Sequence, residues 1–282
     1  MPGEVKILPP DPCGIVRVQL HHPGKRNAMS VQMWHALRTA FLGFQADQQL
    51  RCILIEGSAE SGEAAFCAGG DISEYPAFRF DPAALRDFHE NAVWGGLSAM
   101  LDCDVPIVAA ISGACMGAGV EIAACADLRI AGASARFGAP IARLGFPMAP
   151  REAALVATAA GALTARQMLL EAATFGAAEM AARGFIGSVV DEGDLPAAAQ
   201  ASAQRIAALA PEAARRNKQM LRALLAAPMA AAQQLAGQGV QGRPGEDVYA
   251  YADGAEHREG IAAFLAKRTP VFATRSFDPS RT

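Results

Sequence analysis

The sequence carries little net charge and no block of charge of one sign. Its 25 Lys and Arg residues stand against 28 Asp and Glu residues, which gives a formal net charge of −3. Binding to nucleic-acid phosphates needs a concentrated footprint of Lys and Arg. Because this footprint is missing, we expect no nucleic-acid partner.

Secretory and membrane signals are also missing. The opening segment Met1–Lys6 lacks the charged start and the apolar run of a secretory signal. The most apolar long stretch, Ile107–Ala131, is interrupted by Glu121 and Asp127. A membrane span would have to bury both carboxylates without partners. We therefore expect a cytoplasmic protein with no membrane partner, in which this stretch forms core.

The cysteines give no sign of a disulfide framework or a metal site. The chain has 6 of them, none in CxxC spacing, and most lie inside apolar runs. This pattern predicts buried, reduced thiols. The HExxH and GxSxG motifs are absent as well, so neither a zinc site nor a serine-hydrolase nucleophile is predicted.

What the chain does have is a large apolar content arranged in alternating patterns. With 282 residues and 52% hydrophobic side chains, it can bury a substantial core in one large or two small domains. Strand patterns alternate with helical ones in the first two thirds. The expected strands are Ile15–Leu20, Cys52–Ile55, Pro106–Ile111 and Leu128–Ala131, and the expected helices are Val31–Ala46 and Pro82–Leu101. This alternation predicts an α/β fold with a largely parallel sheet.

After about Leu195 the composition changes to Ala-rich segments with helical periodicity. These segments are Leu195–Leu209, Pro211–Ala226, Met229–Gly237 and His257–Lys267. They contain too few large apolar side chains to form a core alone, so we expect them to pack on the α/β part or on another subunit. The sequence thus divides into an α/β core, residues 1–194, and a C-terminal helical region, residues 195–282.

One glycine-rich segment, Ala65–Ile72, could carry chemistry. Its strand and loop run into Gly69 and Gly70 and then into Asp71. A turn of this kind can expose a backbone N–H, and Gly70 has no side chain to block a ligand. The alternative is an ordinary glycine turn that Asp71 caps.

A second glycine-rich segment, Ile111–Glu121, enters a helix through small residues. Its backbone N–H groups could point at a developing negative charge. Glu121 follows in the first turn among apolar neighbours, where burial would raise the pKa of its carboxyl group toward acid–base use. A glutamate favoured by the helix dipole is the alternative. Two N–H donors and one carboxyl group are a minimal set for enolate chemistry.

Taken together, these motifs resemble the crotonase family, the enoyl-CoA hydratase/isomerase superfamily. The matching segments, in family order, are Arg26–Met29, Ala65–Ile72, Pro106–Gly113, Met116–Glu121, Cys125–Ala131 and Glu259–Arg268. Each segment is weak alone, but six in the family order, from about residue 13 to 272, are specific.

The resemblance implies a spiral of ββα units with a C-terminal trimerisation region, assembled as a homotrimer or a dimer of trimers. It also implies an acyl-CoA thioester substrate and no separate cofactor, because coenzyme A is carried as part of the substrate. The implied oxyanion-hole donors are the backbone N–H groups of Gly70 and Ala118. The implied substrate-binding positions are Lys25, Arg26, Ala28, Ala68, Asp71, Ile72, Ile141, Phe264 and Lys267. For Phe264 and Lys267, a core phenylalanine and a solvated lysine are equally good readings.

The sequence departs from the family where hydratases carry their second glutamate. Glu121 occupies the first glutamate position, but Ile141 occupies the second, and isoleucine cannot transfer a proton. Glu152 and His89 are candidates for a replacement, although a surface glutamate at a helix start and a partly exposed histidine are the favoured readings. Glu121 alone is therefore assigned proton transfer.

Hydration or dehydration of an enoyl-CoA is the favoured reaction because Glu121 is present. Double-bond isomerisation, thioester hydrolysis and decarboxylation remain open. A catalytically weak acyl-CoA-binding protein is a further alternative, because Ile141 replaces the second carboxylate. A purely structural oligomer fits least well with two intact glycine-rich loops. Met100, Ile141 and Phe146 are candidates for an apolar lining of the acyl pocket.

Overall fold

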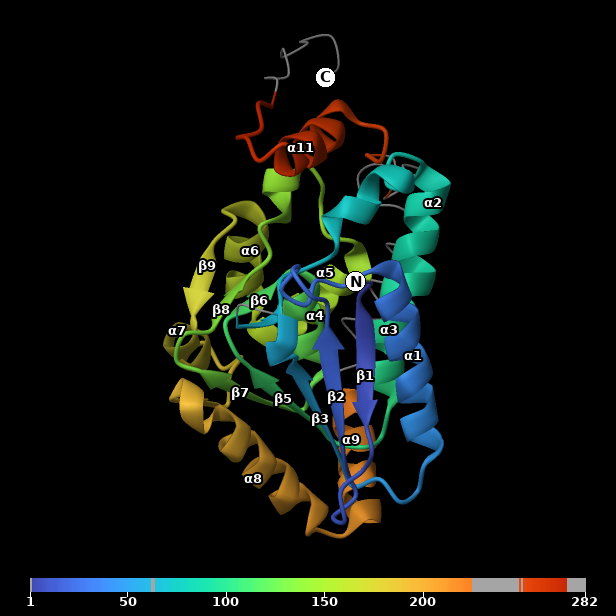
Figure 1. The fold of residues 1–282 in the computed structure, drawn as a ribbon, viewed down its shortest axis with the longest axis vertical. Coiled ribbons are helices and arrows are strands. Elements are labelled where there is room, and N and C mark those ends of the chain that lie inside the picture. Colours follow the sequence, from blue (N-terminus) through green and yellow to red (C-terminus); the bar gives the residue numbers. More distant parts are fainter. Residues whose placement is uncertain (1, 62–63, 225–248, 250, 273–282) are drawn as a thin grey trace.

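The computed structural model describes residues 2–61, 64–224, 249 and 251–272. Two β-sheets form its centre, with helices around them (Figure 1). The larger sheet has the strand order β1-β2-β3-β5-β7-β10 and the smaller one has the order β4-β6-β8-β9.

The larger sheet is parallel apart from β1. Its strands are β1 (Glu4–Leu8), β2 (Ile15–His21), β3 (Cys52–Gly57), β5 (Ile107–Ile111), β7 (Leu128–Gly132) and β10 (Ser188–Val190). Only β1 pairs antiparallel, with β2. The strands predicted at residues 15, 52, 106 and 128 are therefore all present and adjacent, which confirms the α/β prediction.

Both faces of this sheet are buried, because successive side chains of a strand point to opposite faces. In β3, Ile53 and Ile55 join the main core, whereas Cys52 and Leu54 face the helix α8 (Leu195–Ala207). β5 divides in the same way, and Figure 1 shows α8 crossing one face of the sheet. The C-terminal region therefore begins by packing on the core.

The smaller sheet makes the fold a spiral. Its strands are β4 (Ala65–Cys67), β6 (Ala114–Met116), β8 (Arg136–Gly138) and β9 (Thr174–Gly176). The chain passes from β3 to β4, from β5 to β6 and from β7 to β8, and so steps between the sheets before each helical segment. The loops after β4 and β6 are thereby brought side by side, since β4 and β6 pair directly.

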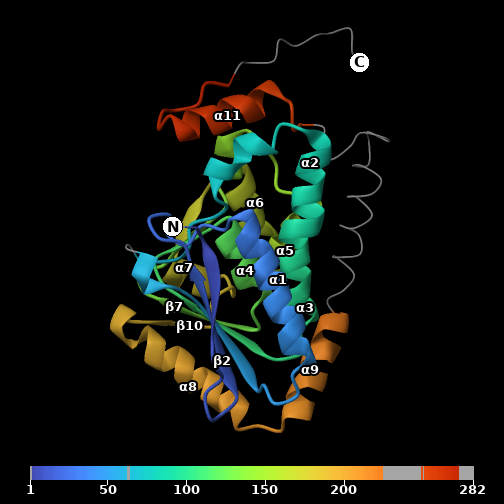
Figure 2. The same cartoon turned by 45° about the vertical axis from the view of Figure 1, so that its right-hand side comes forward.

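Helices cover the remaining faces and one end of the molecule (Figures 1 and 2). They are α1 (Val31–Ala46), α2 (Pro82–Asp87), α3 (Trp94–Asp102), α4 (Ala118–Cys125), α5 (Pro150–Ala160), α6 (Ala162–Leu170), α7 (Ala177–Ala182), α9 (Pro211–Leu224) and α11 (Ala255–Leu265). Short 3-10 segments are η1 (Ala59–Ser61), η2 (Ile72–Ala77), η4 (Ile141–Leu144) and η5 (Glu192–Asp194). None of these described helices is long and apolar enough to cross a membrane.

The helix predicted from residue 82 to 101 is present but irregular. Asp81 caps it, accepting a hydrogen bond from the Ala84 N–H at 2.7 Å. Between α2 and α3 lies a π-helical segment, η3 (Phe88–Val93). Such segments widen a helix by one residue per turn and often occur at functional sites.

Some expectations need correction or fall outside the described residues. Cys13 is exposed, unlike the other five cysteines, because it lies in the turn between β1 and β2. The helix expected at residues 229–237 lies outside the described residues. Helices α8, α9 and α11 match the other three Ala-rich segments, while the domain boundary at residue 195 and the trimerisation role stay predictions.

Candidate functional site

A cavity of about 800 Å³ lies at the end of the molecule where α11 is found. Its walls come from the loop after β4, the loop after β6, the π-helical segment η3, the start of α5 and the end of α11. Glu121, Glu152 and His89 are among the titratable side chains that line it.

The two glycine-rich loops meet at this cavity. The Met29 N–H donates to the Gly69 carbonyl, and the Asp71 N–H donates to the Met29 carbonyl, both at 2.8 Å. Gly69 and Gly117 adopt φ values of +116° and +47°, which favour glycine. A Cβ on Gly117 would lie 3.8 Å from the Gly69 Cα, so the loops are in direct contact.

The backbone N–H groups of Gly70 and Ala118 are unpaired at this junction. Neither donates a hydrogen bond to any acceptor among the described residues. Ala118 is the first residue of α4, where a helix leaves its N–H groups without intrahelical partners. Both residues line the cavity. Two donors from adjacent loops can stabilise an oxyanion placed between them.

Glu121 presents a buried carboxyl group to the same cavity. It is 8% exposed, and no described residue donates a hydrogen bond to its side chain. Burial is the largest cause that raises the pKa of Glu121, the negative charge of Glu152 acts in the same direction, and Arg79 partly opposes both, so that the pKa is about 8. At pH 7 the Glu121 carboxyl group therefore holds a proton.

Glu152 and His89 form a buried pair across the cavity wall. Glu152, in the first turn of α5, is 3% exposed. Its Oε1 lies 3.0 Å from His89 Nδ1. Burial lowers the pKa of His89 despite the hydrogen bond to Glu152, so the imidazole is neutral and donates through Nδ1. The His89 ring also stacks on Tyr249 at a centroid distance of 5.7 Å.

A buried guanidinium completes the polar groups around the cavity. Arg79 follows η2 and lies over the rings of Tyr75 and Phe146. Its Nε donates to His257 Nε2 at 3.3 Å. Arg79 thus links the loop after η2 to helix α11.

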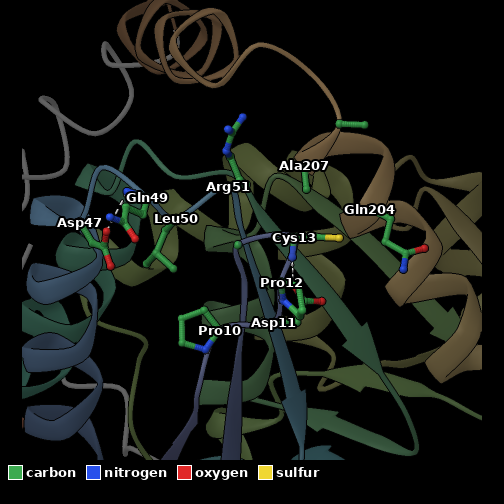
Figure 3. Close-up of a pocket in the computed structure, with 12 residues that line it drawn as sticks. Pro10, Asp11, Pro12, Cys13, Asp47, Gln49, Leu50, Arg51, Gln204 and Ala207 are labelled. Atoms are coloured by element: carbon green, nitrogen blue, oxygen red, sulfur yellow. Dashed lines mark hydrogen bonds between the residues drawn. The ribbon is translucent and has the colours of Figure 1, made fainter.

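A second hollow, at the opposite end of the larger sheet, is lined by fewer groups that could take part in catalysis. Its volume is about 630 Å³, and it lies between the β1–β2 turn, the loop before β3 and the end of α8 (Figure 3). Asp11 there accepts hydrogen bonds from the backbone N–H groups of Cys13 and Ile15. Because this carboxylate is occupied in shaping the turn, the first cavity is the better candidate site.

Comparisons with known proteins show the family of the chain. The family described as enoyl-CoA hydratase/isomerase matches residues 11–275. The chain belongs to this family. A probable enoyl-CoA hydratase of Mycobacterium bovis is 31% identical over 92% of this chain and 94% of its own length. A probable enoyl-CoA hydratase of Rhizobium meliloti is 30% identical, with the same coverage of both chains.

Solved structures of the family share the fold. The crystal structure of an enoyl-CoA hydratase/carnitine racemase from Magnetospirillum magneticum superposes with a TM-score of 0.74 at 32% identity, covering 95% of each chain. This protein is thus an acyl-CoA enzyme of the enoyl-CoA hydratase/isomerase family.

Most positions that the family resemblance implies lie around the cavity. All of them line it except Arg26. Lys25 makes an ion pair with Asp71 at 2.6 Å and also donates to Ser73. Phe264 is 53% exposed at the edge of the cavity. Met100 is buried but does not line the cavity, whereas Ile141 and Phe146 do.

The expectations of a surface Glu152 and a partly exposed His89 are wrong. Both are buried and both line the cavity. The first turn of α5 carries Glu152, as predicted, but this helix points its N-terminus at the cavity instead of at solvent. The run of small and apolar residues after Glu152 was the one sequence signal for its burial. Arg79 and Tyr75 were not identified from the sequence.

We predict that Glu121→Gln stabilises the fold at neutral and alkaline pH. The folded pKa of about 8 lies above the ordinary value of 4.5, so unfolding releases a proton between these pH values. Wild-type stability is therefore lost as pH rises from about 4.5 to 8, whereas glutamine carries no charge to bury. Each pKa unit is worth about 1.4 kcal/mol, so the gain at pH 8 is a few kcal/mol in urea unfolding.

The exposed Glu212, in the first turn of α9, provides a matched control. Glu212→Gln should change the free energy of unfolding by less than about 0.5 kcal/mol. A Glu121→Gln variant less stable than wild type at pH 8 would contradict the burial argument.

Proposed function

We propose that the protein hydrates enoyl-CoA thioesters and dehydrates the corresponding 3-hydroxyacyl-CoA thioesters. One observation carries this proposal. The cavity that holds the unpaired N–H groups of Gly70 and Ala118 also holds two buried carboxyl groups, Glu121 and Glu152. Water addition needs one acid and one base, and these two groups supply both although Ile141 occupies the family's second glutamate position.

The two carboxyl groups take different roles in the proposed reaction, with Glu121, whose pKa is raised, as the acid and Glu152 as the base. The thioester oxygen accepts hydrogen bonds from Gly70 and Ala118, which stabilise the enolate as charge develops on it. Glu152, as a carboxylate, removes a proton from water while the water oxygen bonds to C3. Glu121, as a neutral acid, donates its proton to C2. The sum is addition of one water molecule, and proton exchange between the two groups restores the starting state.

His89 acts as a positioning residue for Glu152 in this scheme. Its neutral ring donates Nδ1–H to Glu152 Oε1 at 3.0 Å, and stacking on Tyr249 fixes the plane of the ring. One carboxylate oxygen is thereby held, and the other is left for water.

The coenzyme A part of the substrate is proposed to leave the cavity along Lys25 and Lys267, with Phe264 at the edge. All three residues line the cavity, and the positive charge of a lysine side chain suits a phosphate group.

We also propose that the chain assembles as a homotrimer or a dimer of trimers. Exposed apolar side chains on α6 and α9, namely Leu163, Leu170, Met220, Leu221 and Leu224, support assembly through these helices.

We predict that Glu121→Gln and Glu152→Gln each lower kcat for crotonyl-CoA hydration by about 10²- to 10⁴-fold. Neither amide can exchange the proton that the wild-type carboxyl group exchanges. The measurement is loss of the enoyl-thioester absorbance, with Glu212→Gln as the control. Unchanged turnover in either variant would remove that residue from the mechanism, and binding without wild-type turnover would favour a binding role.

The pH profile should report the coupling between the two carboxyl groups. Hydration by wild type is expected to fall as pH rises through about 8, where Glu121 loses its proton. Glu152→Gln removes the charge that raises the pKa of Glu121, so the fall in residual kcat/KM should move to lower pH. If kcat/KM falls at the same alkaline pH in both proteins, the charge of Glu152 does not affect the pKa of Glu121.

The oxyanion hole can be tested by removing one backbone donor. Ala118→Pro deletes the N–H at the first position of α4, where proline is well tolerated. We predict a loss in kcat of about 10²- to 10³-fold with little change in helix content.

The control for this variant is Ala162→Pro. Ala162 is the first residue of α6 and likewise follows a glycine with positive φ, Gly161. It lies outside the cavity, so activity should be retained. An equal loss of kcat in both variants would mean that the effect comes from a disturbed fold and not from the missing Ala118 N–H.

A further inference from the structure

Arg79 is a buried cation whose partners are all uncharged. Its residue is 1% exposed, yet it lines the cavity. The guanidinium carbon lies 4.3 Å from the ring centroid of Tyr75 and 3.9 Å from that of Phe146. These rings contribute cation–π attraction but no anion.

The polar contacts of Arg79 are two neutral imidazoles. Nε donates to His257 Nε2 at 3.3 Å, and Nη1 lies 3.5 Å from His89 Nε2. Each ring holds its own proton on Nδ1, because His257 Nδ1 contacts the Ala252 carbonyl and His89 Nδ1 contacts Glu152. Burial lowers the pKa of both histidines, which keeps them uncharged acceptors.

The remaining nitrogen of the guanidinium has nothing to bind. Nη2 is buried and has no hydrogen-bond partner among the described residues. No carboxylate of the described residues forms an ion pair with Arg79: Glu152 contacts His89, and Arg79 affects Glu121 only through its electric field. A desolvated guanidinium with unused donors is costly unless an anion meets it. The planar group is suited to a carboxylate.

We propose that Arg79 binds a carboxylate on the acyl group, so that the substrates are thioesters of dicarboxylic acids. The inference rests on the proposed function for the placement of the thioester in the Gly70 and Ala118 junction. It adds a second anchor at the far side of the acyl group. The apolar wall that Ile141 and Phe146 provide would then face the carbon chain between the two anchors.

The alternative is that Arg79 has only a structural role and connects η3 to α11 through His89 and His257. Replacement of a purely structural Arg79 would lower stability and would weaken the binding of all acyl-CoA thioesters equally. If Arg79 binds a carboxylate, the protein should bind a thioester with a terminal carboxylate more tightly than its uncharged carboxamide. This preference distinguishes the two roles of Arg79.

The experiment measures binding of saturated thioesters, which cannot be hydrated. Succinyl-, glutaryl- and adipyl-CoA are titrated calorimetrically into the full-length protein, each beside its terminal carboxamide. For the acyl-chain length that reaches Arg79, wild type should bind the carboxylate thioester at least about 10-fold more tightly than the carboxamide thioester. This ratio is in keeping with a hydrogen bond to a charged group. Equal binding of acid and amide at all three lengths would overturn the proposal.

Variants assign the preference to the residue. Arg79→Met should bring the acid-to-amide ratio close to one, and Arg79→Lys should keep part of it. The control is Arg215→Met, which removes another buried arginine whose Nη2 donates to the Asp47 and Leu50 carbonyls away from the cavity. A preference that survives in Arg79→Met would overturn the assignment. If that variant does not fold, the wild-type comparison still decides.

This inference and the proposed function fail separately. Tight binding of a dicarboxylic thioester without hydration of its enoyl form would overturn hydration and leave the Arg79 site standing. Hydration of crotonyl-CoA with no preference for a carboxylate would overturn the Arg79 site and leave the proposed hydration standing.

Discussion

The site depends on the burial of Glu121 next to the negative charge of Glu152. An ionised carboxyl group in this cavity would lose its hydration without gaining a hydrogen bond, so the group keeps its proton and its pKa rises to about 8. The same burial lowers the pKa of His89, which then supports Glu152 as a neutral donor. In the proposed mechanism, the same cavity therefore holds an acid, Glu121, and a base, Glu152.

Close backbone packing of the loops after β4 and β6 and of helix α4 places Glu121 in this cavity. The spiral puts β4 and β6 side by side, and the glycines at the ends of these strands allow the two loops to touch. A Cβ on Gly119 would collide with the Cys67 carbonyl, so α4 can sit close against β4 only because that side chain is absent. Glu121 lies in the first turn of α4, where the helix dipole offsets part of the cost of any negative charge. Extensive apolar burial in the two sheets stabilises the fold that holds this polar site.

The sequence predicted what local patterns encode. Apolar runs identified the strands β2, β3, β5 and β7, and the capping pair Asp81 and Pro82 identified the start of α2. The glycine-rich loops, Glu121 and the substitution at Ile141 were also visible, because each is a motif within a few residues.

The rest could not be predicted because it depends on contacts between distant segments. His89 and Glu152 are 63 residues apart, and Arg79 and His257 are 178 apart. No pattern around these residues indicates that a π-helical segment, a helix start and α11 meet at one cavity. The short strands β6, β8 and β9 are defined by pairing more than by periodicity. Burial of Glu152 reversed an interpretation that rested on its helix position alone.

The proposed chemistry requires Glu121 to be a neutral acid in the protein without ligand. The most direct measurement is the ¹³C chemical shift of the Glu121 side-chain carboxyl carbon as a function of pH, assigned with Glu121→Gln, in protein without ligand. We expect a titration midpoint near pH 8, with the protonated form dominant at pH 7. A midpoint near the ordinary value of 4.5 would contradict it, because a charged Glu121 would show that the cavity does not desolvate this group.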